Sequence, residues 1–172
     1  MVGHRDNRGF TLVELVIAIA LLGIVSVTVS SRWFSTDAFQ ADTLKEQLIA
    51  EARLAQRTAL ANSQISVSLV VSEAAGDWRY QIFQDDGSGR TLMREVANDT
   101  SGVTIEVTTG ATQVLGPGVD FDLTYDGLGN AESLDIGGVS QNVASGVFFE
   151  LMGGTHELCI SPLGFAHEGN CV

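Results

Sequence analysis

The sequence predicts an α+β protein in which a long N-terminal helix packs against a C-terminal antiparallel β domain of one bent sheet or two sheets. Three observations lead to this prediction. An apolar run opens the helix, an amphipathic helical pattern continues it, and apolar and polar residues then alternate between Gly-rich turns. We therefore divide the chain into a polar leader (1–9), an apolar helical half (10–31), an amphipathic helical half (32–62) and a globular β domain (63–172).

The apolar half reads FTLVELVIAIALLGIVSVTVSS and contains one charged residue, Glu14. As a helix that rises about 1.5 Å per residue it would measure about 33 Å, enough to cross a hydrocarbon core of about 30 Å. Arg5 and Arg8 precede the run, and basic residues tend to stay on the cytoplasmic side of a membrane. We therefore expect residues 1–9 in the cytoplasm, a single transmembrane helix, and the β domain outside.

Glu14 separates three interpretations of this segment. A secretory signal peptide cleaved near Val29-Ser30-Ser31, or an uncleaved signal anchor, would place a carboxylate in lipid at a cost of about 2.5–3.5 kcal/mol without using it. Cleavage between Gly9 and Phe10 would give the carboxylate a use, because Phe10 would then carry a positive α-amino group. Glu14 of one subunit could pair with that amine on a neighbouring helix and so set the axial register.

The string Gly9-Phe10-Thr11-Leu12-Val13-Glu14-Leu15 resembles the processing and methylation signature of type IV pilins and type II secretion pseudopilins. The resemblance implies removal of residues 1–9 by a prepilin peptidase, N-methylation of Phe10, and a role for Glu14 in subunit assembly. It also implies a protein of the bacterial inner membrane, with its β domain in the periplasm, that later joins a filament. Many members of the family carry Pro where this chain has Ser31, so the helix lacks that breaking point.

The implied partners are other pilin or pseudopilin subunits, contacted through the N-terminal helix, the prepilin peptidase, and the assembly platform of the inner membrane. The strand order and the tail around Cys159–Phe165 are similar to the GspH/FimT group of minor pilins, and within it to minor pilins of mannose-sensitive haemagglutinin (MSHA) type pili. We therefore expect a structural minor subunit that acts in filament initiation or at the tip. The alternatives are a type II secretion pseudopilin and a pilus-tip adhesin or DNA-uptake module.

Residues 32–62 carry an apolar stripe at steps of three to five residues, as expected for a helix. The stripe consists of Phe39, Leu44, Leu48, Ala52, Ala55 and Ala59, widened by Ile49 and Leu60. The charged residues assigned to the opposite, solvated face are Asp42, Lys45, Glu46, Glu51, Arg53 and Arg57. No Pro or Gly occurs between Ile24 and Asn62, so we expect one continuous helix from about residue 10, with any loosening near residues 35–37. A coiled-coil seam is the alternative, but sustained heptads are lacking.

Beyond Asn62 the apolar period changes to two, and no second helix is expected. The predicted strands are Ile65–Val71, Trp78–Phe83, Thr91–Val96, Val103–Val107, Val119–Tyr125, Ser133–Ile136, Val147–Leu151 and Glu157–Ser161. Gly-containing turns separate most of them.

The formal net charge is −12, and every Lys and Arg lies at or before Arg94. Affinity for nucleic acids depends on Lys and Arg that neutralise phosphates, so we expect no nucleic-acid partner. The sequence also lacks a Gly-x-Ser-x-Gly elbow, a phosphate-binding loop and a His-Glu-x-x-His motif. We therefore expect neither an enzyme nor a cofactor.

The two cysteines, Cys159 and Cys171, are expected to form a disulfide if the β domain lies outside the cytoplasm. Such a bond would stabilise the fold by up to about 3 kcal/mol. Free thiols are one alternative. A zinc site is another, since His156 and His167 complete a set of four possible ligands, although in an unfamiliar spacing.

A calcium site is a further hypothesis, because Asp120, Asp122 and Asp126 follow one another within seven residues and Ca²⁺ prefers oxygen ligands. The spacing is not that of an EF-hand. Phe121, Leu123 and Tyr125 alternate with the acids, so an amphipathic strand explains the same pattern without a metal.

Overall fold

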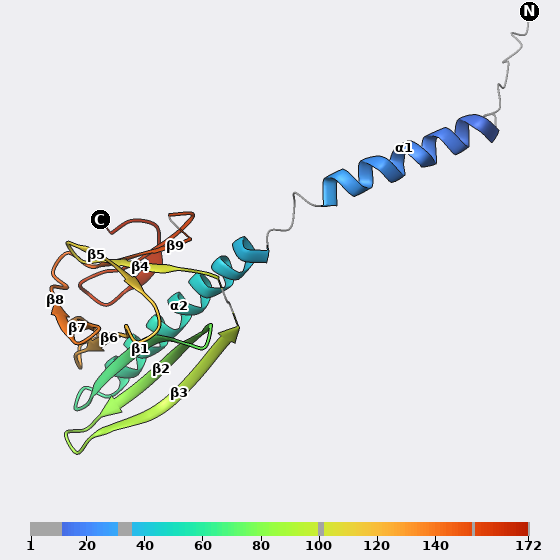
Figure 1. The fold of residues 1–172 in the computed structure, drawn as a ribbon. Coiled ribbons are helices and arrows are strands. Elements are labelled where there is room, and N and C mark those ends of the chain that lie inside the picture. Colours follow the sequence, from blue (N-terminus) through green and yellow to red (C-terminus); the bar gives the residue numbers. More distant parts are fainter. Residues whose placement is uncertain (1–11, 31–35, 100–101, 153, 172) are drawn as a thin grey trace, which may run out of the picture. The chain divides into compact units, whose positions relative to one another are not determined.

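The computed structural model describes residues 12–30, 36–99, 102–152 and 154–171 (Figure 1). The chain divides into two compact units, Met1–Thr36 and Asp37–Val172. The first contains helix α1 (Leu12–Ser30), and the second contains helix α2 (Thr36–Ala61) from its second residue onward. Residues 31–35 lie outside the described residues, so the continuity of one helix through them stays a prediction.

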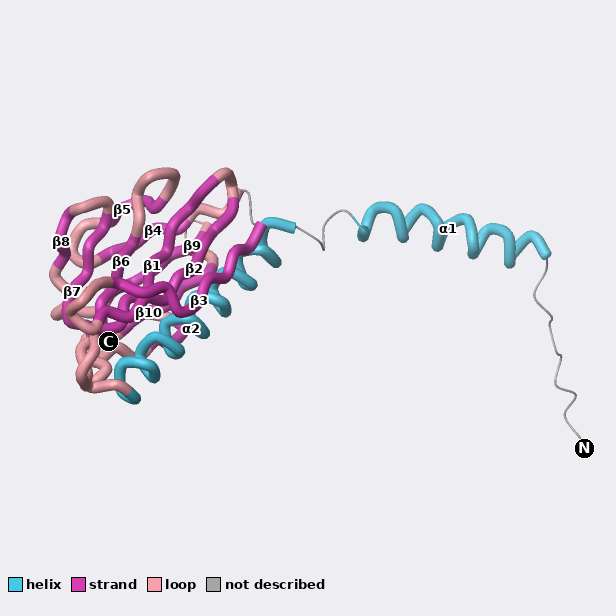
Figure 2. The backbone as a smooth tube through the Cα atoms, turned by 90° about the horizontal axis from the view of Figure 1, so that it is seen from below, coloured by secondary structure: helices cyan, strands magenta, loops and turns pink. Residues whose placement is uncertain are grey.

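The rest of the second unit consists of strands and turns. The strands are β1 (Ser66–Ala74), β2 (Asp77–Asp85), β3 (Arg90–Asp99), β4 (Ile105–Thr108), β5 (Thr112–Leu115), β6 (Phe121–Tyr125), β7 (Ala131–Ile136), β8 (Val139–Gln141), β9 (Val147–Leu151), β10 (His156–Ile160) and β11 (Ala166–Glu168). They form two antiparallel sheets with the orders β3-β2-β1-β6-β7-β8 and β11-β10-β9-β4-β5. The predicted α+β class is confirmed, with two sheets rather than one bent sheet, and Figure 2 shows α2 running along the strands.

Each of the eight predicted strands overlaps a strand of the structure, but the sequence did not predict β5, β8 or β11. These three strands are only three or four residues long, and each forms an edge of its sheet. A short edge strand has few side chains facing the core, so it leaves little alternation in the sequence.

The register of the larger sheet places apolar residues side by side. Leu69 of β1 lies opposite Ile82 of β2 on one side and Leu123 of β6 on the other, and Leu123 in turn faces Leu134 of β7. All four side chains are buried. Because a shift of one residue would turn this row outward, the row fixes the pairing of the strands.

Three contacts join the sheets and the helix into one core. The rings of Phe121 (β6) and Phe149 (β9) meet edge to face at 5.1 Å and connect the two sheets. The Tyr80 hydroxyl donates a hydrogen bond to the Leu44 carbonyl of α2 at 3.2 Å, and burial raises the pKa of Tyr80 well above its ordinary value. The hydrophobic core therefore lies between α2 and both sheets.

The buried stripe of α2 is narrower than predicted. It consists of Ala41, Leu44, Leu48, Ala52, Ala55 and Ala59, at steps of three or four residues, with Ile49 beside it. Phe39 and Leu60 are 75% and 54% exposed, so their assignment to the stripe was wrong. At about 100° per residue, Phe39 points away from Ala41 and Leu60 points to one side of Ala59.

Two charged residues assigned to the solvated face are in fact buried. Lys45 is 9% exposed and Glu51 is 2% exposed. Lys45 follows Ala41 by four residues and Glu51 follows Leu48 by three, so both share the packed side of the helix. Charged side chains usually lie in solvent, but these two can be buried because each has a partner of opposite charge.

The Lys45 ammonium lies 3.1 Å from Asp42, 3.6 Å from Glu46 and 3.4 Å from Glu168 of β11. Burial works against the charged form, but the carboxylates of Asp42 and Glu168 hold the pKa of Lys45 above its ordinary value. The ammonium thereby ties the first half of α2 to the last strand of the smaller sheet.

Candidate functional site

Glu14 lies in the first turn of α1, which begins at Leu12. A carboxylate at this position is favourable for the helix itself, because the helix N-terminus carries partial positive charge. The predicted cleavage site at Gly9 and Phe10, and the methylated nitrogen of Phe10, lie outside the described residues. The predicted roles of Gly9, Phe10 and Glu14 therefore remain predictions.

The described part of α1 shows apolar side chains on every side. Those of Leu12, Val13, Leu15, Val16, Ile17, Ile19 and Leu21 are all between 50% and 79% exposed. A helix that is apolar all round needs other helices or lipid to cover it. Measured over the described residues, none of the helices reaches the length and hydropathy of a membrane span.

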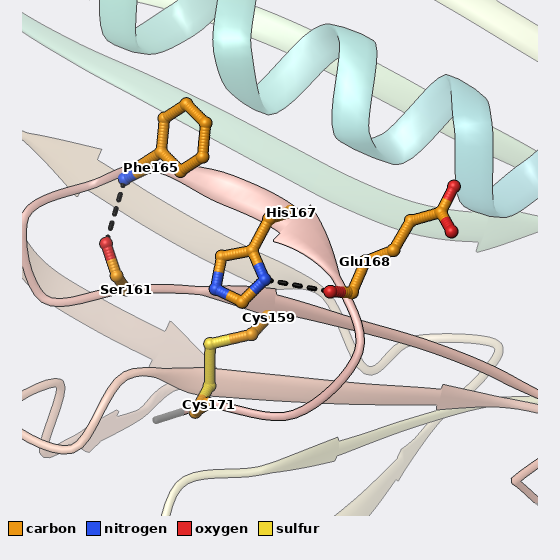
Figure 3. The surroundings of a disulfide bond; sticks show 6 residues. All are labelled: Cys159, Ser161, Phe165, His167, Glu168 and Cys171. Atoms are coloured by element: carbon orange, nitrogen blue, oxygen red, sulfur yellow. Dashed lines mark hydrogen bonds between the residues drawn. A yellow bond between two sulfur atoms is a disulfide. The ribbon is translucent and has the colours of Figure 1, made fainter.

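The β domain contains the predicted disulfide between Cys159 of β10 and Cys171, twelve residues further along the chain (Figure 3). The loop that it closes contains β11, in which His167 pairs with Cys159 across the hairpin. The disulfide thereby fastens the C-terminal segment to the smaller sheet.

The zinc alternative is not supported by the residues that it would need. Both thiols are consumed by the disulfide. His156 lies 3.6 Å from Asp42 on α2, whereas a ring nitrogen of His167 is hydrogen-bonded to the Glu168 carbonyl at 2.9 Å. The two imidazoles thus serve contacts within the fold.

Two of the three calcium candidates likewise have other roles. Asp122 pairs with Arg90 of β3 at 2.6 Å. Asp126 accepts hydrogen bonds from the backbone of Leu128 and Asn130 and from the Asn130 amide, while Asp120 is exposed. Among the described residues no three His, Cys, Asp or Glu side chains gather as they would around a metal ion.

Asp126 holds the turn between β6 and β7. Burial by itself would raise the pKa of its carboxyl group, but the hydrogen bonds from Asn130 and Leu128 outweigh burial and lower the pKa below its ordinary value. The carboxylate form therefore stabilises the turn, which explains an acid here without a metal.

Sequence reasoning missed the polar contact between the helix and the edge strand β3. Glu51 of α2 accepts hydrogen bonds from Arg94 of β3 and from Gln47. Its spacing of three residues from Leu48 was the available signal, since that spacing places a side chain on the packed face.

A family model described as the prokaryotic N-terminal methylation motif matches residues 4–30. No curated protein and no solved structure matches the chain. The matched residues include Gly9, Phe10 and Glu14. The motif is a type IV pilin-like signal, and it supports a pilin-like or pseudopilin subunit that is processed by a prepilin peptidase and assembles with other pilins.

Proposed function

We propose that this chain is a minor pilin or pseudopilin that is cut after Gly9, N-methylated on Phe10, and built into an extracytoplasmic filament through its N-terminal helix. The observation that carries the proposal is the methylation motif over residues 4–30. Glu14 in the first turn of an otherwise apolar helix supports it. The β domain then has a structural role outside the membrane.

The proposed chemistry of assembly is a pairing of opposite charges between subunits. Cleavage creates an α-ammonium at Phe10, and a neighbouring Glu14 supplies the carboxylate. In an apolar environment a charge without a partner is far less favourable than a pair, so helices stop sliding where amine and carboxylate meet. The exposed apolar side chains of α1 supply the remaining contact surface.

The proposed topology places residues 10–31 in the inner membrane before assembly, with residues 1–9 in the cytoplasm and the β domain in the periplasm. Two features support it: Arg5 and Arg8 ahead of the apolar run, and the disulfide, a bond that persists in oxidising compartments.

The proposed system is an MSHA-like type IV pilus, in which the chain would act in the initiating or tip complex. A minor pseudopilin of type II secretion is the alternative, because the same motif serves both systems. Neighbouring genes for a pilus or for secretion distinguish the two. A DNA-uptake role is disfavoured because residues 95–172 contain no Lys or Arg.

The substitution Glu14→Gln tests the proposal, since it removes the charge but preserves the size of the side chain. In cells that express the complete assembly system, we expect the variant to lose its leader normally and to disappear from sheared filaments. Glu132→Gln, the same change on the exposed side of β7, is the matched control and should assemble. Incorporation of Glu14→Gln at the level of the parent protein would contradict the proposal.

A further inference from the structure

The C-terminal half of α2 and two neighbouring turns form a surface that combines arginine with exposed apolar side chains. We call it the Arg53 surface, and it consists of Arg53, Arg57, Leu60, Leu128, Leu163 and Phe165. The four apolar members are between 51% and 75% exposed. Arginine and aromatic residues are enriched where proteins bind one another, and exposed apolar patches mark such sites.

The fold brings these residues together through Gln56. Its amide donates hydrogen bonds to the carbonyl of Gly129 at 3.1 Å and to that of Leu163 at 2.8 Å. These bonds hold the β6–β7 and β10–β11 turns against the helix. Leu60 also packs so closely on Gly129 that a Cβ atom there would lie 2.8 Å from its side chain, so the surface is continuous.

The two arginines are fixed by contacts that leave their charge available. The Arg53 Nε atom donates to the Ala166 carbonyl at 2.9 Å, and its guanidinium lies 5.3 Å from the centre of the Phe165 ring. The Arg57 Nε atom donates to the Arg53 carbonyl at 3.1 Å. Figure 3 shows the Phe165 ring directed toward the helix.

Neither arginine lies within 4.0 Å of a carboxylate of the described residues, although Lys45, Arg90 and Arg94 each do. Residues 37–172 contain nineteen acidic and six basic residues, which leaves a formal charge of −13. Arg53 and Arg57 are thus two adjacent cations in a strongly acidic domain, and a carboxylate-rich surface is the partner that they fit.

The same domain presents such a surface on another face. A cleft of about 430 Å³ is lined by Asp120, Asp122 and Asp135, with Val70 and Phe83 as its apolar part. Arg90 also lines it and pairs with Asp122 at 2.6 Å, so Asp120 and Asp135 supply the two carboxylates that remain available to a partner. Phe83 belongs to the alternate set of β2 residues that points away from α2, whereas Tyr80 points toward α2. The cleft thus lies on the outer face of the larger sheet, while the Arg53 surface lies on α2 and its neighbouring turns.

We infer that the Arg53 surface of one copy docks against the acidic cleft of a second copy. Because the two surfaces differ, the contact joins two copies head to tail and does not close into a symmetric dimer. The inference rests on the proposed function in that filament assembly brings the copies into register. A lipid surface fits less well, since a domain of this net charge is repelled by anionic membranes.

Photo-crosslinking in cells that express the full chain tests this contact. The probe is p-benzoylphenylalanine in place of Phe165, and mass spectrometry identifies the peptide that it captures. We expect an adduct of two copies, with the second copy modified between residues 118 and 138. The same probe at Phe39, which is exposed on α2 outside the Arg53 surface, is the matched control and should not capture that peptide.

Charge exchange makes the test specific. Arg57→Glu and Asp120→Lys change exposed residues and should each lower the yield of the adduct at least tenfold. A mixture of the two variants, each in a separately tagged copy, should restore an adduct from Arg57→Glu to Asp120→Lys only if these surfaces meet. Failure of the mixture to restore it would overturn the inference.

Filament incorporation, measured in the same cells, separates this inference from the proposed function. If the chain enters filaments but the probe captures lipid, a different protein or another region of the chain, the docking contact is wrong and the proposed function stands. If the chain is neither cleaved after Gly9 nor present in filaments, both are wrong.

Discussion

The Nε atom of Arg94 on β3 donates to both carboxylate oxygens of Glu51 on α2, at 3.1 and 3.0 Å. The Glu51 side chain is almost completely buried, and Gln47 donates to it at 2.7 Å. Since β3 is an edge strand with a neighbour on one side only, this ion pair attaches it to the helix.

Replacing Arg94 by Met is expected to destabilise the β domain, because Glu51 would remain buried with a single hydrogen-bond partner. Arg94 is half exposed, so solvent weakens its attraction to Glu51. We therefore expect a loss of about 2 kcal/mol in the free energy of unfolding. Urea denaturation of the full-length protein in detergent, followed by the fluorescence of buried Trp78, measures it.

The double variant Glu51→Met, Arg94→Met is the control for this prediction. It replaces both charges by apolar side chains of similar length, so it should recover most of the lost stability. If the double variant is less stable than Arg94→Met, the prediction is wrong, because removal of the unpaired buried charge of Glu51 would then not restore stability.

The hydrogen-bonded carboxylate of Asp126 should make the stability of the β domain depend on pH. The pKa of Asp126 is lowered in the folded protein. Its contribution to the free energy of unfolding is therefore fully present above the ordinary carboxyl pKa of about 3.9, and it is lost as the pH falls through the lower pKa of the folded protein. Asp126→Asn should be about 1 kcal/mol less stable than the parent at pH 7, and the difference should shrink below pH 4. Glu132→Gln, which removes a charge without disturbing this turn, should show no such convergence.

Removal of the disulfide is expected to weaken the smaller sheet. The bond closes a loop over twelve positions, so the double variant Cys159→Ser, Cys171→Ser should lose about 2–3 kcal/mol. The denaturation midpoint of the parent should fall to that of the variant when a reductant is added. An unchanged midpoint on reduction would mean that the bond does not stabilise the domain.

Gly164 and Gly138 form a matched pair for testing close packing. Both have positive φ angles, +78° and +84°, but a Cβ atom at Gly164 would collide with the Gly129 carbonyl, whereas nothing lies near a Cβ atom at Gly138. Gly138→Ala should lose about 1 kcal/mol from backbone strain alone. Gly164→Ala should lose at least about 2 kcal/mol more, and equal losses would contradict the packing of the two turns.

The sequence allowed prediction of the features that arise from repetition along the chain. The alternation in β6 and β9, and the stripe from Leu44 to Ala59, follow directly from burial at fixed periods. The disulfide was also predictable, because the chain has only two cysteines.

Features that depend on the partner of a residue could not be predicted in this way. Nothing local shows that Lys45 reaches Glu168, or that Arg94 reaches Glu51, because these pairs form only after the strands have folded onto the helix. The Arg53 surface likewise combines residues from α2 and two distant turns. The processing segment differs, since the sequence of residues 9–15 itself predicts cleavage and assembly.

The most direct test of the account is intact-mass and fragment-ion analysis of the N-terminus of the native protein, purified from cells that contain its assembly system. We expect the first residue to be Phe10 with a methyl group on its α-nitrogen. A protein that begins at Met1, or one that begins near Arg32 after signal-peptide cleavage, would contradict it.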